Sequence, residues 1–171
     1  MNRKLFYLPV HEIDLYGKEN LIYGSLTEKG VCSLVDIIQK YLSGHVYLFD
    51  LGCGDGWLIG EIERAIEGSI CEGVEISQHR VDLQKNDLSI WQGDMLEEDF
   101  RQYNWLHANN LCLEDLIAEK LEKKIIDEFK GLYISYRKAQ NIDFLRKTVC
   151  IGGFDIEATW GVHTVYLYDI I

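Results

Sequence analysis

The residues best suited to chemistry stand in one glycine-rich stretch, LFDLGCGDGWLIGEI, at positions 48–62. Gly52, Gly54 and Gly56 follow an apolar run directly and precede residues with helical spacing. Glycine lets a chain turn tightly and lets a ligand approach the main chain without meeting a Cβ atom. The stretch therefore predicts a loop that binds a ligand through its backbone. A purely structural turn is the alternative explanation of the same glycines.

Three carboxylates are placed to contact different parts of a nucleoside. Asp50 precedes the glycines and can anchor the loop or receive an ammonium group. Glu75 comes 21 positions after Gly54, at the end of an apolar run, where a carboxylate can accept hydrogen bonds from both ribose hydroxyls. Asp94 follows the next such run and can meet the exocyclic amino group of a base. Open α/β sheets bind nucleotides at the edge where such strand ends meet.

Alternating strand and helix patterns position these residues. Short apolar runs predict strands at 45–51, 69–76, 89–96, 103–110 and 131–137, and strand-like segments at 148–160 and 162–171 flank a turn at Gly161. Helical spacing predicts helices from Ser25, which has capping-box spacing to Glu28, from Trp57, and over 113–129. A short helix fits between 77 and 87. The pattern predicts a mostly parallel α/β sheet with helices on both faces and a C-terminal antiparallel hairpin.

Length and composition favour one domain over residues 1–171 and an intracellular protein. No apolar run is long enough for a membrane span or a signal peptide. The five cysteines are scattered without a C-x-x-C pair, so neither a zinc site nor a disulfide framework is expected. We therefore expect no metal.

The formal net charge of −11 disfavours non-specific binding to nucleic-acid backbones. Between Lys120 and Lys147, eight basic residues and four acidic ones leave a local charge of +4, against −15 in the rest of the chain. A solvated helix face with alternating charges is one explanation. The other is an acidic body that attracts a basic partner and has one basic edge.

The segment DLGCGDG resembles the first motif of class I S-adenosylmethionine-dependent methyltransferases, D-x-G-x-G-x-G, whereas a dinucleotide fingerprint would read G-x-G-x-x-G. GVEI and QGDM resemble the second and third motifs of that superfamily. The resemblance implies a Rossmann-like fold with a seven-stranded sheet, and S-adenosyl-L-methionine as the cofactor.

Three further segments resemble Dot1-like protein lysine methyltransferases. They are IYGSLTEKGVCSLVDII, the paired asparagines of HANNLCLED, and ATWGVHTVYLYDII, and the resemblance covers roughly residues 20–171. Adenine-N6 methyltransferases carry Pro-Pro after the fourth strand, and this chain has no proline beyond Pro9. The resemblance implies methyl transfer to a lysine side chain of a basic, histone-like protein.

The same resemblance assigns roles to individual residues. Residues 1–24 would form an N-terminal segment and a cofactor-closing loop, with Tyr23, Gly24 and Thr27 lining that loop. The cofactor's methionine part would contact Asp50, Gly52 and Gly54, the ribose Glu75, and the adenine Asp94 and Met95. Asn109 would lie beside the reactive methyl, and Leu111, Trp160 and Tyr166 would wall a lysine channel. Asn109, Tyr166 and Trp160 are the catalytic candidates. The chain departs from the family pattern at Ser25, where the loop glutamate is expected, and at Leu111, where an aromatic residue is expected.

Methyl transfer to an amine is an in-line displacement that mainly requires positioning, and an apolar channel favours the neutral amine. A purely structural role is the alternative explanation for each of these residues. Asn109 and Asn110 could cap the helix that starts near Leu113. Trp160 and Tyr166 could pack in the core of the hairpin. His107 could face the sheet or a helix instead of acting as a base. A small-molecule or RNA methyltransferase, or a non-catalytic S-adenosylmethionine-binding protein, is the alternative function. The oligomeric state is left open.

Overall fold

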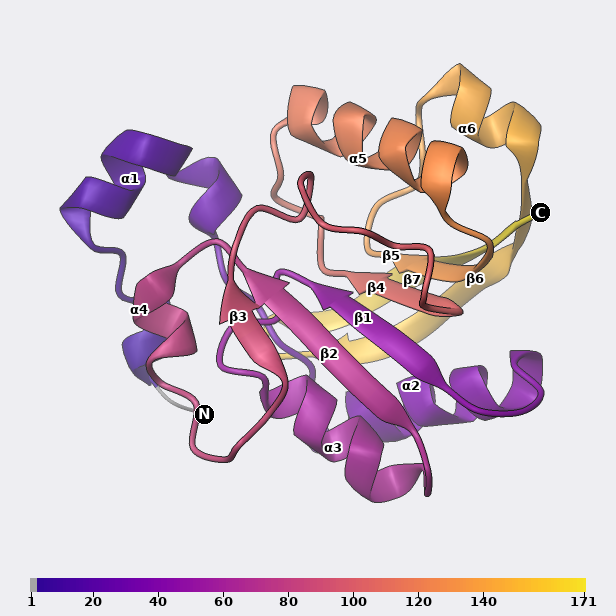
Figure 1. Ribbon diagram of the computed structural model, residues 1–171, viewed down its shortest axis with the longest axis horizontal. Coiled ribbons are helices and arrows are strands. Elements are labelled where there is room, and N and C mark those ends of the chain that lie inside the picture. The colour runs from indigo at the N-terminus through magenta and orange to yellow at the C-terminus, as the bar shows by residue number, and fades with distance from the viewer. Residues whose placement is uncertain (1–2) are drawn as a thin grey trace.

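A single sheet organises the molecule, which is described here from a computed structural model covering residues 3–171. In chain order its strands are β1 (Tyr47–Leu51), β2 (Ile70–Glu75), β3 (Ile90–Gln92), β4 (Trp105–Ala108), β5 (Gly131–Ser135), β6 (Thr148–Ala158) and β7 (Gly161–Ile170). Their spatial order is β3-β2-β1-β4-β5-β7-β6 (Figure 1). The first five strands are parallel, and β7 runs antiparallel between β5 and β6. The predicted α/β fold class, including the C-terminal antiparallel pair, is confirmed.

Helices cover both faces of this sheet (Figure 1). On one face lie α2 (Glu28–Tyr41) and α3 (Trp57–Ala65), and on the other lie α5 (Asp115–Glu128) and α6 (Ile142–Lys147). The short α4 (Gln78–Val81) follows β2. The N-terminal part holds α1 (Val10–Tyr16) between 3₁₀ turns at Arg3–Phe6 and Glu19–Leu21.

Two hydrophobic clusters explain why the central strands are apolar on both faces. In β1, Leu48 belongs to the cluster under α2 and α3, and its neighbour Phe49 belongs to the cluster under α5. Both side chains are fully buried, as are Leu34 and Ile38 of α2. Complete burial of one such side chain contributes about 1.5–3 kcal/mol. A near-continuous apolar run is therefore what a strand buried on both faces requires.

The start of α2 differs from the expectation. The Ser25–Glu28 capping box is wrong, because α2 begins at Glu28 with Thr27 as its N-cap, and Thr27 Oγ1 accepts a hydrogen bond from the Gly30 amide at 3.1 Å. The backbone of Ser25 is used elsewhere, since its carbonyl accepts from the Thr159 amide at 2.8 Å. The turn between β6 and β7 thereby fixes the segment before α2. The helices α1 and α6 were not predicted.

Candidate functional site

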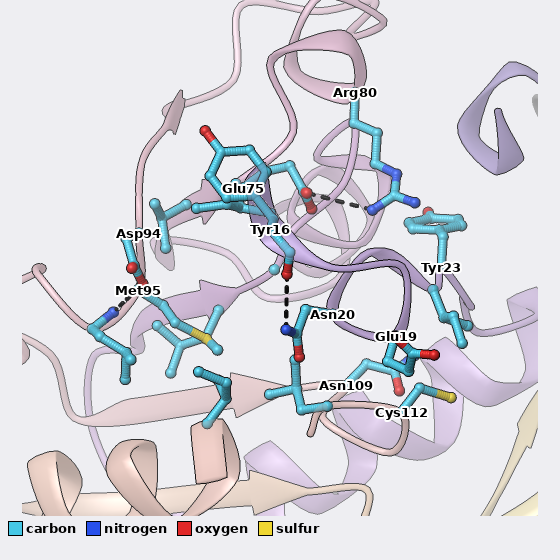
Figure 2. A pocket seen from close by; sticks show the side chains of 18 of the residues that line it. Tyr16, Glu19, Asn20, Tyr23, Glu75, Arg80, Asp94, Met95, Asn109 and Cys112 are labelled. Carbon is cyan, nitrogen blue, oxygen red and sulfur yellow. Dashed lines mark hydrogen bonds and ion pairs between the residues drawn. The ribbon is translucent and has the colours of Figure 1, made fainter. Parts of the chain in front are cut away.

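The main cavity of the molecule lies at the carboxyl ends of the central strands and has a volume of about 280 Å³. Gly52, Glu75, Asp94 and Asn109 line it, one from the segment after each of β1, β3 and β4 and one from the last position of β2. Figure 2 shows Glu75, Asp94 and Asn109 around this cavity, with Tyr16 and Asn20 of the N-terminal part beside them. Apolar walls are supplied by Leu51, Val74, Ile76 and Leu96. The volume is just below the range of about 300–1,000 Å³ that is typical of small-molecule sites.

The glycine loop adopts backbone conformations that favour glycine. Gly52, Gly54 and Gly56 all have positive φ, at 88°, 62° and 76°. A Cβ atom on Gly54 would lie 2.5 Å from Tyr23 Cε2, so this glycine allows the ring to pack on the loop. A Cβ atom on Gly52 would meet no atom within 4 Å, and Gly52 lines the cavity. Gly52 therefore leaves room for a ligand, and Gly54 leaves room for a side chain of the protein.

Glu75 holds the glycine loop and also lines the cavity. Its Oε2 accepts a hydrogen bond from the Gly54 amide at 2.9 Å, and its Oε1 accepts from the Ser77 amide at 3.0 Å and lies 3.5 Å from Arg80 Nη1. Burial raises the pKa of this carboxyl, and the charge of Arg80 and the two amides act in the opposite direction. Glu75, the residue expected to bind the ribose, is thus held at the cavity in a fixed orientation.

Asp94 and Met95, for which adenine contacts were expected, follow β3. Asp94 is exposed, and its Oδ1 accepts a hydrogen bond from the Leu96 amide at 2.9 Å. Met95 is half-buried and packs against the cluster under α5. Both residues line the cavity, and their contact with an adenine stays a prediction.

The N-terminal segment 3–24 lines the cavity with residues from Leu15 onward and is fastened to the start of α4 and to Arg80 within it. Arg80 Nε donates to the carbonyl of Leu5 at 3.1 Å, its Nη2 donates to the carbonyl of Leu21, and its guanidinium lies 5.2 Å from the centre of the Tyr23 ring. Nearby, Glu12 accepts from Ser77 Oγ at 2.6 Å. Of the segment predicted to close over the cofactor, residues 1 and 2 lie outside the described residues. Tyr23 and Gly24 do line the cavity.

Arg80, Glu12, Tyr16 and Asn20 were missed by the sequence argument. The four-residue helix α4 is too short to show a periodic pattern, and the partners of Arg80 lie 59 and 75 positions earlier in the chain. One signal was available, because Arg80 comes shortly after a strand that ends in a carboxylate.

The paired asparagines have different surroundings. Asn109 lines the cavity, and its Nδ2 donates to the carbonyl of Gly24 at 2.9 Å. Asn110 is buried, and its amide bonds Ser135 Oγ and accepts from the Tyr136 backbone amide at 2.9 Å. Neither caps α5, because that helix starts at Asp115 after Glu114. The helix-capping explanation of the two asparagines is therefore wrong.

A second, small cavity of about 20 Å³ lies behind the glycine loop and shares Gly52 and Asn109 with the main cavity. Asp50, His107 and Tyr136 line it. His107 Nδ1 lies 2.7 Å from Asp50 Oδ1, and His107 Nε2 lies 3.1 Å from the Tyr136 hydroxyl. Asp50 thus stands beside the loop, where an ammonium or loop contact was expected, and not in the main cavity.

Thr27, Trp160 and Tyr166 do not line either cavity. Thr27 caps α2, and its hydroxyl donates to Glu157 Oε1 at 2.8 Å. The Trp160 ring lies against Gly24 and beside Tyr136, and 43% of the residue is exposed.

Tyr166 stands opposite Ser135 in the β5–β7 pair and packs against the cluster under α5. Trp160 lies instead beside Tyr136, which belongs to the cluster under α2 and α3. The structure therefore does not bring Trp160 and Tyr166 together as walls of one channel. Leu111 is 37% exposed and does not line either cavity.

Within residues 3–171, no helix is long and apolar enough to cross a membrane, and no group of three or more His, Cys, Asp or Glu side chains could hold a metal ion. The five cysteines are free thiols.

Comparison with known proteins gives structural neighbours only. No protein-family model matches the chain, and no curated protein sequence matches it significantly. TrmN from Thermus thermophilus superposes with a TM-score of 0.60 at 11% identity, over 82% of this chain and 48% of that one, so this chain spans about half of TrmN. PH1948 from Pyrococcus horikoshii, described as a candidate RNA methyltransferase, superposes with a TM-score of 0.58 at 16% identity, over 100% of this chain and 98% of that one.

Identities this low establish the fold alone, and that fold is the Rossmann-like α/β fold of class I methyltransferases. These two neighbours give no support to the Dot1-like assignment.

Proposed function

We propose that this chain is an S-adenosylmethionine-dependent methyltransferase. One observation carries the proposal, namely that Gly52, Glu75, Asp94 and Asn109, from the ends of four neighbouring strands, line one cavity. Two carboxylates on adjacent strand ends suit the ribose hydroxyls and the base amino group of a nucleoside. Gly52, which has free space where a side chain would project, suits the close approach of a ligand to the backbone.

The residues present fit this cofactor, and each has a distinct task. Glu75 would hold the ribose, Asp94 with Met95 the adenine, and Gly52 with Asp50 the amino-acid end. When bound, the cofactor supplies an electrophilic methyl group. The protein's contribution is then to orient the acceptor and exclude water, and Asn109, at the junction of the two cavities, is the residue best placed to do so.

RNA is the acceptor class that the comparisons favour, since PH1948 matches over the whole of this chain. The expected lysine channel lacks support, because Trp160 lies beside Tyr136 whereas Tyr166 packs against the cluster under α5, and neither lines a cavity. The net charge of −11 argues in the other direction and favours a basic protein as the second candidate. An RNA substrate would have to contact the basic segment around α5 and α6, which includes the exposed residues Lys120, Lys123, Lys130 and Lys138.

Calorimetric titration with S-adenosylhomocysteine tests the cofactor. We expect binding by the wild type and a loss of about tenfold or more in Glu75→Gln, because a hydrogen bond to a charged group contributes about 1.5–3 kcal/mol. Glu97→Ala, an exposed residue on the loop after β3, is the control and should bind normally. Absence of binding by the wild type would refute the proposal.

Transfer of tritiated methyl from the labelled cofactor to RNA, core histones and a cell lysate tests the acceptor. Labelled RNA that survives protease and is lost with ribonuclease supports the RNA reading, and labelled histone supports the second candidate. For a basic protein acceptor, kcat/KM should fall steeply with salt, because exposed charges are screened over about 8–10 Å.

A further inference from the structure

Two exposed lysines of α5 have no counter-charge within the described part of the protein. No carboxylate of residues 3–171 forms an ion pair with Lys120 or Lys123. Their neighbour Lys124 is by contrast partly buried and pairs with Glu128 at 2.6 Å. A lysine ammonium group is a compact, hydrated point charge on a flexible stem, so the two unpaired groups can contact an anion from outside the protein.

The carboxylates of α5 compensate little of this charge. Four of the five acidic side chains on the helix already have a partner within the protein, namely Asp115, Glu122, Asp127 and Glu128. The fifth, Glu119, is exposed. Outside the segment from Lys120 to Lys147 the chain has a net charge of −15. A polyanion is therefore repelled by most of the chain and attracted to this helix.

The unpaired lysines lie on a line that begins at the main cavity. Leu113 and Ile117 line the cavity, and Leu116 beside them is 60% exposed. Leu116, Lys120 and Lys123 have the spacing i, i+4 and i+7, which places them on one side of α5. At a rise of 1.5 Å per residue, the two lysines lie about 6 Å and 10 Å along the helix from Leu116. A strand that reaches the cavity along α5 would therefore pass both ammonium groups.

A third lysine lies near the same end of α5. Arg137 Nη1 donates to the carbonyl of Leu113 at 3.1 Å, and its Nη2 donates to Asp115 Oδ1 at 2.6 Å. These bonds hold the segment after β5 against the start of the helix. Lys138 is the next residue, is exposed and has no ion pair within residues 3–171. Because consecutive Cα atoms are about 3.8 Å apart, Lys138 stands close to the end of α5 at the cavity.

We propose that Lys120, Lys123 and Lys138 form a docking surface for the phosphate backbone of a single-stranded RNA, which leads the strand along α5 to the main cavity. The inference rests on the proposed function and assigns the surface that binds its RNA acceptor. Phosphate contacts position a nucleic acid without reading its sequence. This surface therefore supplies affinity and direction, and the choice of base is left to the residues around the cavity.

Fluorescence anisotropy with a labelled oligouridylate of about 12 nucleotides measures the contribution of these charges. In Lys120→Gln/Lys123→Gln the helix propensity is kept and two charges are removed. We expect weaker binding, and a plot of log K against log salt that is shallower by about 0.7 for each lysine. Between 50 and 200 mM salt, the double variant should therefore lose about sevenfold less affinity than the wild type.

A matched double variant controls for the loss of charge. Lys40→Gln/Lys85→Gln removes two exposed lysines from other parts of the surface, and Lys40 lies on α2, across the sheet from α5 (Figure 1). It should keep the salt dependence of the wild type. Glu119→Gln provides the converse test, because it removes the unpaired carboxylate from α5 and should bind the RNA more tightly than the wild type. Loss of stability cannot produce such a gain.

The native cysteines show where the strand lies. Cys112 is exposed and lines the main cavity, and Cys32 is exposed on α2. Alkylation by N-ethylmaleimide, followed by mass spectrometry without cofactor, should be slowed by the RNA at Cys112 and not at Cys32. The same RNA concentration should protect Cys112 less in Lys120→Gln/Lys123→Gln.

The outcomes separate this inference from the proposed function. An equal change of salt dependence in the two double variants, unchanged affinity in Glu119→Gln, or unprotected Cys112 overturns the docking surface. Binding of polyglutamate in preference to RNA also overturns it, because the partner would then be an acidic protein. The three lysines do not line either cavity, so their variants should bind S-adenosylhomocysteine normally. Absence of S-adenosylhomocysteine binding by the wild type refutes the proposed function, and that result is read without any RNA.

Discussion

Asn109 donates a hydrogen bond to the carbonyl oxygen of Gly24 at 2.9 Å and so joins the end of β4 to the segment that covers the cavity. These residues are 85 positions apart in the chain. Gly24 is in turn covered by the Trp160 ring, and a Cβ atom there would overlap that ring. The end of β4, the covering segment and the hairpin turn therefore meet at one point beside the main cavity.

Substitution of the two neighbouring asparagines should separate function from stability. In Asn109→Ala we expect a small loss of stability, about 0.5–1.5 kcal/mol for one hydrogen bond, with most of the affinity for S-adenosylhomocysteine retained. Methyl transfer should fall on the order of 100-fold, because small errors of position are costly. Thermal unfolding, calorimetry and single-turnover transfer provide the three measurements. Wild-type turnover would contradict the role of Asn109.

Asn110→Ala is the matched comparison. Asn110 is buried, whereas Asn109 lines the cavity, so the two variants should differ in stability. Loss of the Asn110 amide leaves the buried Tyr136 amide without a partner, at about 1–3 kcal/mol for one unsatisfied group, whereas Ser135 Oγ keeps its bond to the Arg137 carbonyl. We therefore expect a much lower Tm for Asn110→Ala than for Asn109→Ala, and the opposite order would show that the assignment of the two residues is wrong.

The sequence predicted those parts of the site that depend on local pattern. Strand ends at Asp50, Glu75 and Asp94 follow from short apolar runs, and the loop at Gly52 and Gly54 follows from the need for positive φ. In each case the responsible residues are within a few positions of one another. The fold class follows from the same alternation of strand and helix.

The sequence could not predict contacts that join distant segments. Arg80 bonds the carbonyls of Leu5 and Leu21, and a backbone carbonyl leaves no signature in the type of its own residue. Thr27 and Ser25 both suit an N-cap, and only the pairing of Ser25 with Thr159 in the hairpin turn decides between them. The side to which Tyr166 points depends likewise on the register of β7 with β5.

Arg80→Lys should loosen the N-terminal cover without removing the positive charge. Lysine cannot reproduce the planar guanidinium that bonds two carbonyls and lies over Tyr23. We expect a loss of about 1–3 kcal/mol and faster proteolysis within residues 3–24. Arg64→Lys is the control, because Arg64 is exposed, pairs with Glu61 and should change stability by less than about 0.5 kcal/mol. Equal proteolysis of the two variants would contradict the fastening role of Arg80.

Gly52→Ala and Gly44→Ala introduce similar backbone strain, the first at the candidate site and the second away from it. Both glycines have positive φ, at 88° and 100°, and a Cβ atom on either meets no atom within 4 Å. Each substitution should therefore cost about 1–2 kcal/mol of stability. Of the two, only Gly52 lines the cavity, so only Gly52→Ala should lose affinity for S-adenosylhomocysteine in calorimetry. Normal binding by Gly52→Ala would remove the loop from the ligand site.

The stability of Glu122→Gln relative to the wild type should be greater at neutral pH than at acidic pH. Glu122 on α5 is buried, its Oε2 accepts from the Asn141 amide at 3.0 Å, and burial raises the pKa of its carboxyl. The folded state therefore holds the proton more tightly than the unfolded state, so the contribution of Glu122 to stability falls as pH rises from its unfolded pKa of about 4.3 through its higher folded value.

Glutamine can keep the bond to Asn141 and does not titrate. The difference in Tm between Glu122→Gln and the wild type should therefore increase from pH 4 to pH 7, measured by thermal unfolding in matched buffers. Asp55 and Glu75 have pKa values raised in the same direction, but they are present in both proteins and cancel in the difference. Glu122 does not line the main cavity, so binding of S-adenosylhomocysteine should be unchanged. A difference in Tm that stays constant or decreases with pH would contradict the raised pKa.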